Sequence, residues 1–305
     1  MRVLVLGGTG FVGRAIAAAL RSDGAAVTLF HRSPGPGSTD LAGDRDTGDY
    51  TALAGRAWDA VVDVSGYLPR HVGEAMDALG EHAGRYLFIS SHAVFDGGST
   101  ARRALRRDAV LPLTDATYGP AKVACEDDIL ARYGDRATIV RPGKVAGPHD
   151  NQDGLTYWVR RAARGGPIAV PGRPDQPVQV VDARDLAILV VHLLLDNRPG
   201  AFTAVGPTTS LGALIHLCAT AAGTTVELVP VPLDSAPQPF PLVKPEPAWH
   251  TQRRDPGPAR AAGLPVTPLE VTVTDVLAWD TDRGRPPLSR GFTEADEARL
   301  LGAAR

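Results

Sequence analysis

Three glycines near the start of the chain constrain its fold more than any other feature. Gly7, Gly10 and Gly13 follow a short apolar segment, residues 2–6, and open a segment with apolar positions at helical spacing. Those positions are Val12, Ile16 and Leu20. In this order, strand, glycine turn and amphipathic helix let the backbone approach a pyrophosphate, which free N–H groups at the helix N-terminus can bind. The pattern predicts a dinucleotide-phosphate site rather than an ordinary glycine-rich surface turn.

Strands and helices alternate through the rest of the first half. Short apolar runs predict strands, and longer runs with helical periodicity predict helices. The expected strands are 2–6, 26–30, 60–64, 86–90 and 138–141, and the expected helices are 12–21, 69–79 and 118–133. This alternation predicts the α/β class: a Rossmann-type doubly wound parallel sheet with ligands at the carboxyl ends of its strands.

After Pro142 the segments become shorter, and Gly and Pro become frequent. We expect a dinucleotide-binding Rossmann domain over residues 1–142, to which residues 175–199 return. A smaller C-terminal α/β region, within 143–305, is expected mainly to bind substrate. The elements expected after Pro142 are a strand at 178–181 and helices at 185–195, 211–222 and 268–279.

A proline-rich segment, residues 230–247, interrupts the C-terminal region. It holds seven prolines, which exclude a regular helix or a central strand. Two interpretations are open: an extended loop over the site, or a structural spacer.

Composition and charge limit the classes of function. The net charge is −2, which offers little electrostatic support for binding nucleic acid. Cys125 and Cys218 lie in apolar, helix-like segments, as is typical of buried thiols. The eight histidines lack metal-ligand spacing, so no metal site is expected. No apolar run reaches membrane-spanning length and no signal-peptide pattern opens the chain, which favours a cytoplasmic protein without a membrane partner.

Two further patterns place reactive side chains beside the glycine turn. Tyr118 and Lys122 are four residues apart, so a helix puts them on one face. A nearby ammonium lowers the pKa of a phenol, and it can also bind a ribose. Ser90 and Ser91 end an apolar strand, at the sheet edge where a ligand binds. Each pattern alone is also typical of a surface helix pair or of a strand-ending cap.

Together the three patterns give the chain a resemblance to a known family. Over roughly residues 1–195 it resembles the extended short-chain dehydrogenase/reductase family, which contains sugar-nucleotide epimerases, dehydratases and related reductases. Further matching segments are 62–66, 141–143 and 180–187. The resemblance implies that Tyr118 is the general acid/base and that Lys122 lowers its pKa and binds the ribose. It also implies that Ser91, rather than Ser90, polarises the reacting C–O group.

The end of the second strand bears on the choice of cofactor. An enzyme that uses NAD usually places an acid there to hold the ribose 2′-OH. The sequence reads Phe30-His31-Arg32-Ser33, and Arg32 with Ser33 could receive a 2′-phosphate. We therefore favour NADP(H), with NAD(H) as the other possibility. The expected cofactor-binding residues are Gly7, Thr9, Gly10, Phe11, Val12, Gly13, His31, Arg32, Ser33, Asp44, Ser65, Gly66, Tyr118, Lys122, Pro142 and Gly143.

The resemblance also bears on the reaction. Family dehydratases carry an Asp-Glu pair just after the strand-ending hydroxyl, but His92 and Ala93 stand there in this chain. The loss of the carboxylate base argues against dehydration. The expected substrate-binding residues are His92, Lys144, His149, Tyr157 and Trp158. His92 could instead bond locally, and the two aromatic residues could belong to a core. The arginines between Arg102 and Arg107 form either an anion site or a solvated face.

These observations lead to one preferred function and three alternatives. We expect an NADP(H)-dependent oxidoreductase that transfers a hydride at a hydroxyl or carbonyl of a small polar metabolite. The alternatives are a sugar-nucleotide epimerase with tightly bound cofactor, a non-catalytic NADP-binding regulator, and an RNA-binding relative. The intact Tyr118 and Lys122 argue against the regulator, and the near-neutral charge argues against the RNA-binding relative. A homodimer through the helix of Tyr118 is possible, with a face formed by Val123, Ile129 and Leu130.

Overall fold

The structure, a computed structural model, describes residues 1–303 and divides into two compact units. The first unit comprises Met1–Gly143, Ala183–Val205 and Asp255–Pro265. The second comprises Lys144–Asp182, Gly206–Arg254 and the chain from Val266 onward. The returning segment therefore begins at Ala183 rather than at residue 175, because strand β9 (Pro177–Asp182) pairs within the second unit.

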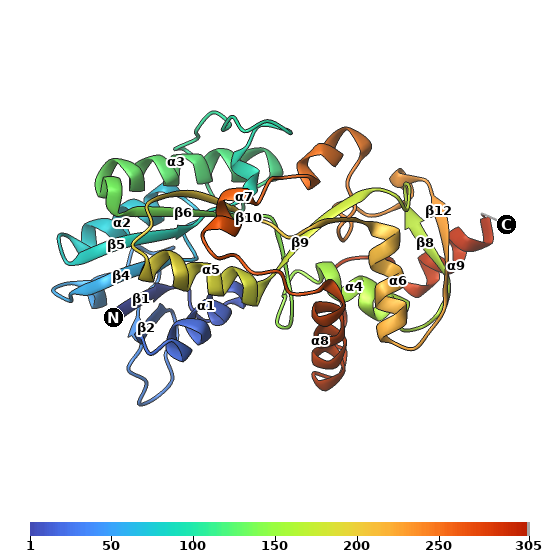
Figure 1. Cartoon of the computed structure of the whole chain (residues 1–305), viewed down its shortest axis with the longest axis horizontal. Coiled ribbons are helices and arrows are strands. Elements are labelled where there is room, and N and C mark those ends of the chain that lie inside the picture. The colour runs from blue at the N-terminus through green and yellow to red at the C-terminus, as the bar shows by residue number, and fades with distance from the viewer. Residues whose placement is uncertain (304–305) are drawn as a thin grey trace. The chain divides into compact units, whose positions relative to one another are not determined.

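A parallel sheet forms the centre of the first unit (Figure 1). It has seven strands in the order β10-β6-β5-β4-β1-β2-β3, and all neighbours run parallel. Apolar runs build the central strands, and residues Val3 to Leu6 of β1 are fully buried. The strands are β1 (Arg2–Leu6), β2 (Ala26–His31), β3 (Leu41–Ala42), β4 (Trp58–Asp63), β5 (Ala83–Ile89), β6 (Ala137–Pro142) and β10 (Gly200–Ala204).

Helices cover both faces of this sheet. On one face α1 (Phe11–Ser22) packs against α5 (Ala183–Leu195), and on the other α2 (Pro69–Leu79) packs against α3 (Asp115–Tyr133) (Figure 1). The short α7 (Gly257–Ala261) lies against β10. A parallel sheet covered in this way confirms the expected doubly wound α/β fold.

The second unit is a smaller α/β assembly. Its strands β8 (Gly166–Pro171) and β12 (Val226–Val231) pair in parallel, and β9 lies between β7 (Lys144–Ala146) and the antiparallel β11 (Thr208–Ser210). Three of its helices pack on one another, and the fourth lies against β8. They are α4 (Gly154–Ala162), α6 (Leu211–Ala221), α8 (Leu269–Asp282) and, against β8, α9 (Glu294–Ala303).

The proline-rich segment is anchored in the core of the second unit. Pro230 lies in β12, which belongs to a two-stranded sheet and so is an edge strand, where proline is tolerated. Phe240 and Val243 are buried in the core cluster, and the Trp158 indole donates a hydrogen bond to the Pro241 carbonyl. At least this part of the segment has a packing role.

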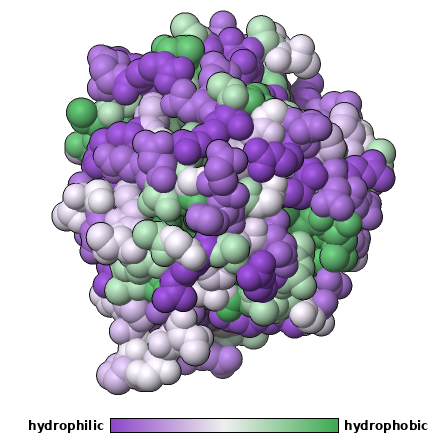
Figure 2. All heavy atoms as spheres, turned by 90° about the vertical axis from the view of Figure 1, so that its left-hand side faces the viewer, coloured by the Kyte–Doolittle hydropathy of each residue, from purple (hydrophilic) through white to green (hydrophobic). Residues whose placement is uncertain are grey.

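The distribution of hydrophilic and hydrophobic residues on the surface is that of a protein with buried apolar side chains. Hydrophilic residues cover most of the face shown in Figure 2, and hydrophobic residues occupy small separate areas of it. None of the helices within residues 1–303 is both long enough and apolar enough to cross a membrane.

Candidate functional site

The glycine turn has the shape that a pyrophosphate requires. Gly7 has a φ of +86°, and a Cβ there would lie 2.6 Å from the Cβ of Ser65. A Cβ at Gly13 would lie 2.2 Å from the Gly7 carbonyl oxygen. Gly10, just before α1, is exposed and has no side chain that could cap the first-turn N–H groups. The backbone is thus open to an anion at the helix N-terminus, so these residues fit a dinucleotide phosphate.

The loop after β4 is held against this turn by a buried ion pair. Arg45 binds the fully buried Asp63, with Nη2 2.9 Å from Oδ2, and Nη1 donates to the Ser65 hydroxyl at 3.0 Å. The Tyr86 hydroxyl also donates to Asp63, at 2.7 Å. Burial raises the pKa of Asp63, but Arg45, the Tyr86 hydrogen bond and Lys122 together lower it by more, so the carboxylate stays charged. Ser65 is thereby fixed beside Gly7.

Sequence reasoning missed this ion pair. The available signal was a charged residue, Asp63, inside an otherwise apolar strand, because such a residue needs a partner. The partner lies 18 residues earlier in the chain, where no local pattern points to it.

Lys122 is buried at the carboxyl edge of the sheet. Its ammonium donates to the carbonyls of Gly66, at 2.8 Å, and Ile89, at 3.0 Å, and lies 4.4 Å from the centre of the Phe88 ring. Burial lowers the pKa of this lysine. Lys122 thus joins α3 to the loop that follows β4 and to the last residue of β5.

Tyr118 lies in α3, one helical turn before Lys122, and its side chain interacts with that of Ser91. Burial raises the pKa of Tyr118, and a side-chain hydrogen bond with Ser91 opposes that rise. The role of Lys122 in lowering the pKa of Tyr118 stays a prediction.

Ser90 and Ser91 have different partners, and a second buried carboxylate, Glu126, is the reason. Glu126 accepts the hydroxyl hydrogen of Ser90 at 2.6 Å and a two-point bond from Arg141, at 2.9 and 2.6 Å. Ser90 is therefore a structural donor. The adjacent Ser91 hydroxyl accepts from the Ala93 N–H and interacts with Tyr118. Sequence reasoning missed Glu126, although it lies one helical turn beyond Lys122.

The other expected cofactor residues surround the carboxyl edge. Arg32 and Ser33 are exposed beyond β2, and His31 at its end contacts Asp40. Asp44 accepts a hydrogen bond from the Asp46 N–H. The remaining members are the exposed Thr9, the half-buried Phe11 and Val12, Pro142 at the end of β6, and Gly143, which bonds to the Ala204 carbonyl.

The arginines between Arg102 and Arg107 bind acceptors of this chain rather than forming an open anion site. Arg102 and Arg107 bind Asp127 and Asp128 of α3, at 2.6 and 2.5 Å. Arg106 binds Asp108, and Arg103 donates to the Phe95 carbonyl. Each guanidinium already has an acceptor, which favours the solvated-face interpretation.

Most of the expected dimer face is buried inside the first unit. Val123 and Ile129 are buried in its core, and of the three residues only Leu130 is exposed.

Two expected substrate residues prove to be core residues of the second unit. Tyr157 and Trp158 are 4% and 0% exposed and pack edge-on against each other and against Phe240. This burial favours the core interpretation over ligand binding, because α4 buries almost all of its surface.

The remaining expected substrate residues are polar and accessible to different degrees. Lys144 donates to Gln152 at 2.8 Å, and burial lowers its pKa. His149 is exposed in a left-handed backbone conformation, with its ring 5.5 Å from that of Trp279. In the first unit, His92 follows Ser91 in a short 3-10 helix, His92–Val94.

Comparison with known families agrees with this geometry. The model of the NAD dependent epimerase/dehydratase family matches residues 3–67 and 59–204, which include the glycine turn, Ser91, Tyr118 and Lys122. The chain belongs to this family. The extended short-chain dehydrogenase/reductase resemblance is thereby confirmed.

Individual relatives are distant. The chloroplast stem-loop binding protein of 41 kDa b of Arabidopsis thaliana is 27% identical over 217 residues, 65% of this chain and 56% of the relative. The match therefore spans little more than half of that protein. An RMD from Pseudomonas aeruginosa, solved with NADPH, has a TM-score of 0.64 at 21% identity and covers 92% of this chain and 98% of that one. UDP-glucuronic acid 4-epimerase from Bacillus cereus, solved with NAD, has a TM-score of 0.67 at 16% identity, covering 93% and 99%. At these identities the solved structures show a shared fold.

Proposed function

We propose that the protein is an NADP(H)-dependent oxidoreductase that transfers a hydride at a hydroxyl or carbonyl of a small polar metabolite. One observation carries the proposal: Tyr118 and Ser91 interact at the sheet edge where the glycine turn opens, one helical turn from a buried Lys122. Family membership supports a nicotinamide cofactor, and solved proteins of the same fold hold NADPH or NAD.

Each of the three residues has a distinct role in the proposal. The Ser91 hydroxyl holds the substrate oxygen, and the Tyr118 hydroxyl gives that oxygen its proton in reduction or takes it in oxidation. Lys122, with two of its three N–H donors on carbonyls, keeps the third for a ribose hydroxyl or the phenolate. When bound, the nicotinamide supplies or accepts the hydride.

NADP(H) is proposed over NAD(H) because Arg32 and Ser33 lie exposed at the end of β2, where a 2′-phosphate would bind. On the substrate side, His92, Lys144 and His149 stay in the proposal. A small molecule is proposed over an RNA partner, although the chloroplast relative is named for stem-loop binding. The net charge of −2 offers little electrostatic support for binding nucleic acid.

Epimerisation with a retained cofactor is the second candidate, favoured by the family description. The two functions differ in how the cofactor is held. An epimerase recycles a tightly bound dinucleotide, whereas a reductase exchanges it with a free pool. Absorbance of the supernatant after acid denaturation of the purified protein distinguishes them: a stoichiometric dinucleotide indicates the epimerase.

Replacing Tyr118 by Phe tests the acid/base role. NADPH oxidation at 340 nm, followed with a panel of aldehydes and ketones, is expected to fall about 100-fold or more, because the variant lacks the hydroxyl that is proposed to protonate the substrate oxygen. NADPH affinity, followed by fluorescence, is expected to stay within about twofold, because the aromatic ring is retained and only its hydroxyl is lost. Cys218→Ser, in the core of the second unit, is the control for changes in expression and folding. Turnover that survives in Tyr118→Phe would show that another group moves the proton.

A further inference from the structure

The fold brings a carboxylate to the end of β2 that the local sequence does not contain. Asp40 immediately precedes β3, which pairs with the last two residues of β2, Phe30 and His31. The loop between them therefore returns Asp40 alongside β2. One carboxylate oxygen accepts the Leu29 N–H at 3.2 Å, and the other lies 3.4 Å from Nε2 of His31.

This carboxylate is held in place and charged. Its side chain is only 19% exposed, and the Asp40 N–H donates to the Ser38 hydroxyl. Burial raises the pKa of Asp40, but bonds involving Leu29, Ser38 and His31 lower it by more, so the pKa lies below its usual range. Asp40 is therefore ionised at neutral pH.

The position of Asp40 matters for the ribose that carries a 2′-phosphate. In this fold the adenosine ribose lies at the end of β2, where family members that use NAD place an acid. Here His31 occupies the end of the strand, and a carboxylate oxygen of Asp40 contacts its imidazole. The positive charge of Arg32 attracts a 2′-phosphate. The negative charge of Asp40, on the neighbouring His31 imidazole, repels it.

We infer that Asp40 is a specificity-determining residue that weakens the preference for NADP(H) set by Arg32. The inference rests on the proposed function, because it concerns the same cofactor site. Taking a separation on the order of 8 Å in a water-like medium, Coulomb repulsion between one carboxylate and a doubly charged phosphate corresponds to about fivefold weaker binding. NADH has no 2′-phosphate and is unaffected.

The test measures the dissociation constants of NADPH and NADH by fluorescence titration of the full chain. Asp40→Asn removes the charge and keeps an oxygen for the Leu29 N–H. We expect NADPH to bind about fivefold more tightly and NADH to change by less than about twofold. Asp40→Ser, a smaller neutral residue, is expected to shift the ratio in the same direction.

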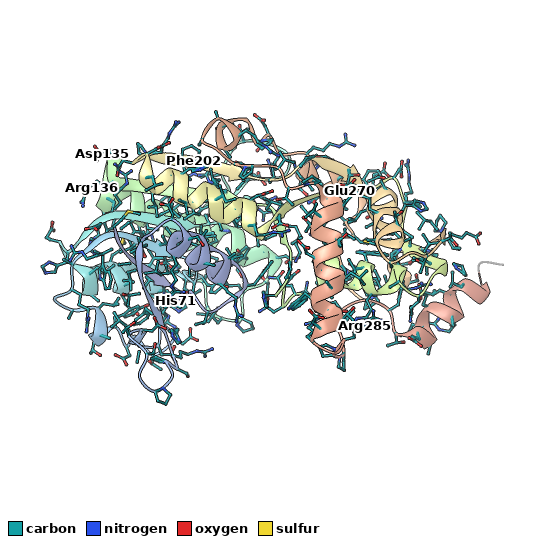
Figure 3. The ribbon with its side chains drawn as sticks, turned by 60° about the horizontal axis from the view of Figure 1, so that its bottom comes forward. His71, Asp135, Arg136, Phe202, Glu270 and Arg285 are labelled. Atoms are coloured by element: carbon teal, nitrogen blue, oxygen red, sulfur yellow. The ribbon has the colours of Figure 1, made fainter. Side chains whose placement is uncertain are left out.

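Two further variants complete the design. Asp135→Asn is the matched control, because this exposed acid precedes β6 and so lies at the amino edge of the sheet (Figure 3), away from the carboxyl ends. It removes the same charge and is expected to change neither constant. Arg32→Ala reports on the proposed function itself, and is expected to weaken NADPH binding by about tenfold or more without affecting NADH.

The outcomes separate the two claims. If Arg32→Ala weakens NADPH binding but both Asp40 variants leave the NADPH/NADH ratio unchanged, the inference is overturned and the cofactor proposal stands. Equal weakening of both cofactors in the Asp40 variants would also overturn it, because that marks a purely structural role. If the wild-type chain binds both cofactors equally and Arg32→Ala changes neither, the preference for NADP(H) fails, whatever Asp40 does.

Discussion

At the residue scale, His71 shows how burial changes an ordinary side chain. It lies in α2 (Figure 3) and is 2% exposed, with Nε2 3.3 Å from a carboxylate oxygen of Asp46. Burial lowers the pKa of His71 to about 4, and the positive charges of Arg45 and Arg70 act in the same direction. The imidazole is therefore neutral in the folded protein at neutral pH.

This histidine makes the stability depend on pH. The pKa is about 6.5 in the unfolded chain and about 4 in the folded one, so the unfolded state binds more protons between these values. We expect the free energy of unfolding to fall as pH falls from about 6.5 to 4, by on the order of 3 kcal/mol from this group.

His71→Gln should make that pH dependence shallower, measured as urea midpoints between pH 4 and 7. His82→Gln, at an exposed histidine just after α2, is the control and should keep the wild-type slope. An unchanged slope in His71→Gln would mean that other groups account for the acid sensitivity.

At the element scale, the junction of β1 and α1 depends on the absence of a side chain. A Cβ at Gly13 would lie 2.2 Å from the Gly7 oxygen and 2.9 Å from the Gly8 Cα, both backbone atoms. Either the turn or the helix must move to accept it. We expect Gly13→Ala to lower the free energy of unfolding by about 2 kcal/mol or more and to weaken NADPH binding at least about tenfold.

Gly73 provides the matched comparison, because it lies inside α2 and a Cβ there meets nothing within 4 Å. Gly73→Ala is expected to stabilise the protein by about 0.5–1 kcal/mol, through helix propensity, and to leave NADPH binding unchanged. Denaturant unfolding and fluorescence titration measure both effects. Wild-type NADPH binding by Gly13→Ala would contradict a phosphate site at this turn.

Element boundaries differ in how far the sequence predicts them. Helix α2 has the expected bounds, because Pro69 is a typical first-turn residue and apolar periodicity covers the rest. Helix α3 begins at Asp115 rather than Tyr118, because Thr114 and Thr117 cap each other across the first turn. Pro120 therefore lies in the second turn of α3. Because proline usually occupies the first turn of a helix, Pro120 by itself would have suggested a later start.

At the scale of the whole molecule, the first unit is discontinuous in sequence. Helix α5 packs on α1, and β10 pairs with β6 at the edge of the sheet, yet both come after residue 182. Residues 1–143 alone would leave the α5-facing surface of α1 and the edge of β6 uncovered. We expect that fragment to lack the cooperative thermal transition of the full chain in circular dichroism. A cooperative melt like that of the full chain would show that the first segment folds independently.

The sequence by itself determined the features that depend on residues close together in the chain. Strand periodicity, the glycine turn and the four-residue spacing of Tyr118 and Lys122 are local patterns, and they predicted the doubly wound sheet and the family. The tertiary structure decided what depends on distant residues. It paired Arg45 with Asp63, held Lys122 on the Gly66 and Ile89 carbonyls, buried Tyr157 and Trp158, and returned Asp40 to the end of β2. The physical reason is that burial and charge pairing are set by which segments meet after folding, and periodicity carries no information about that.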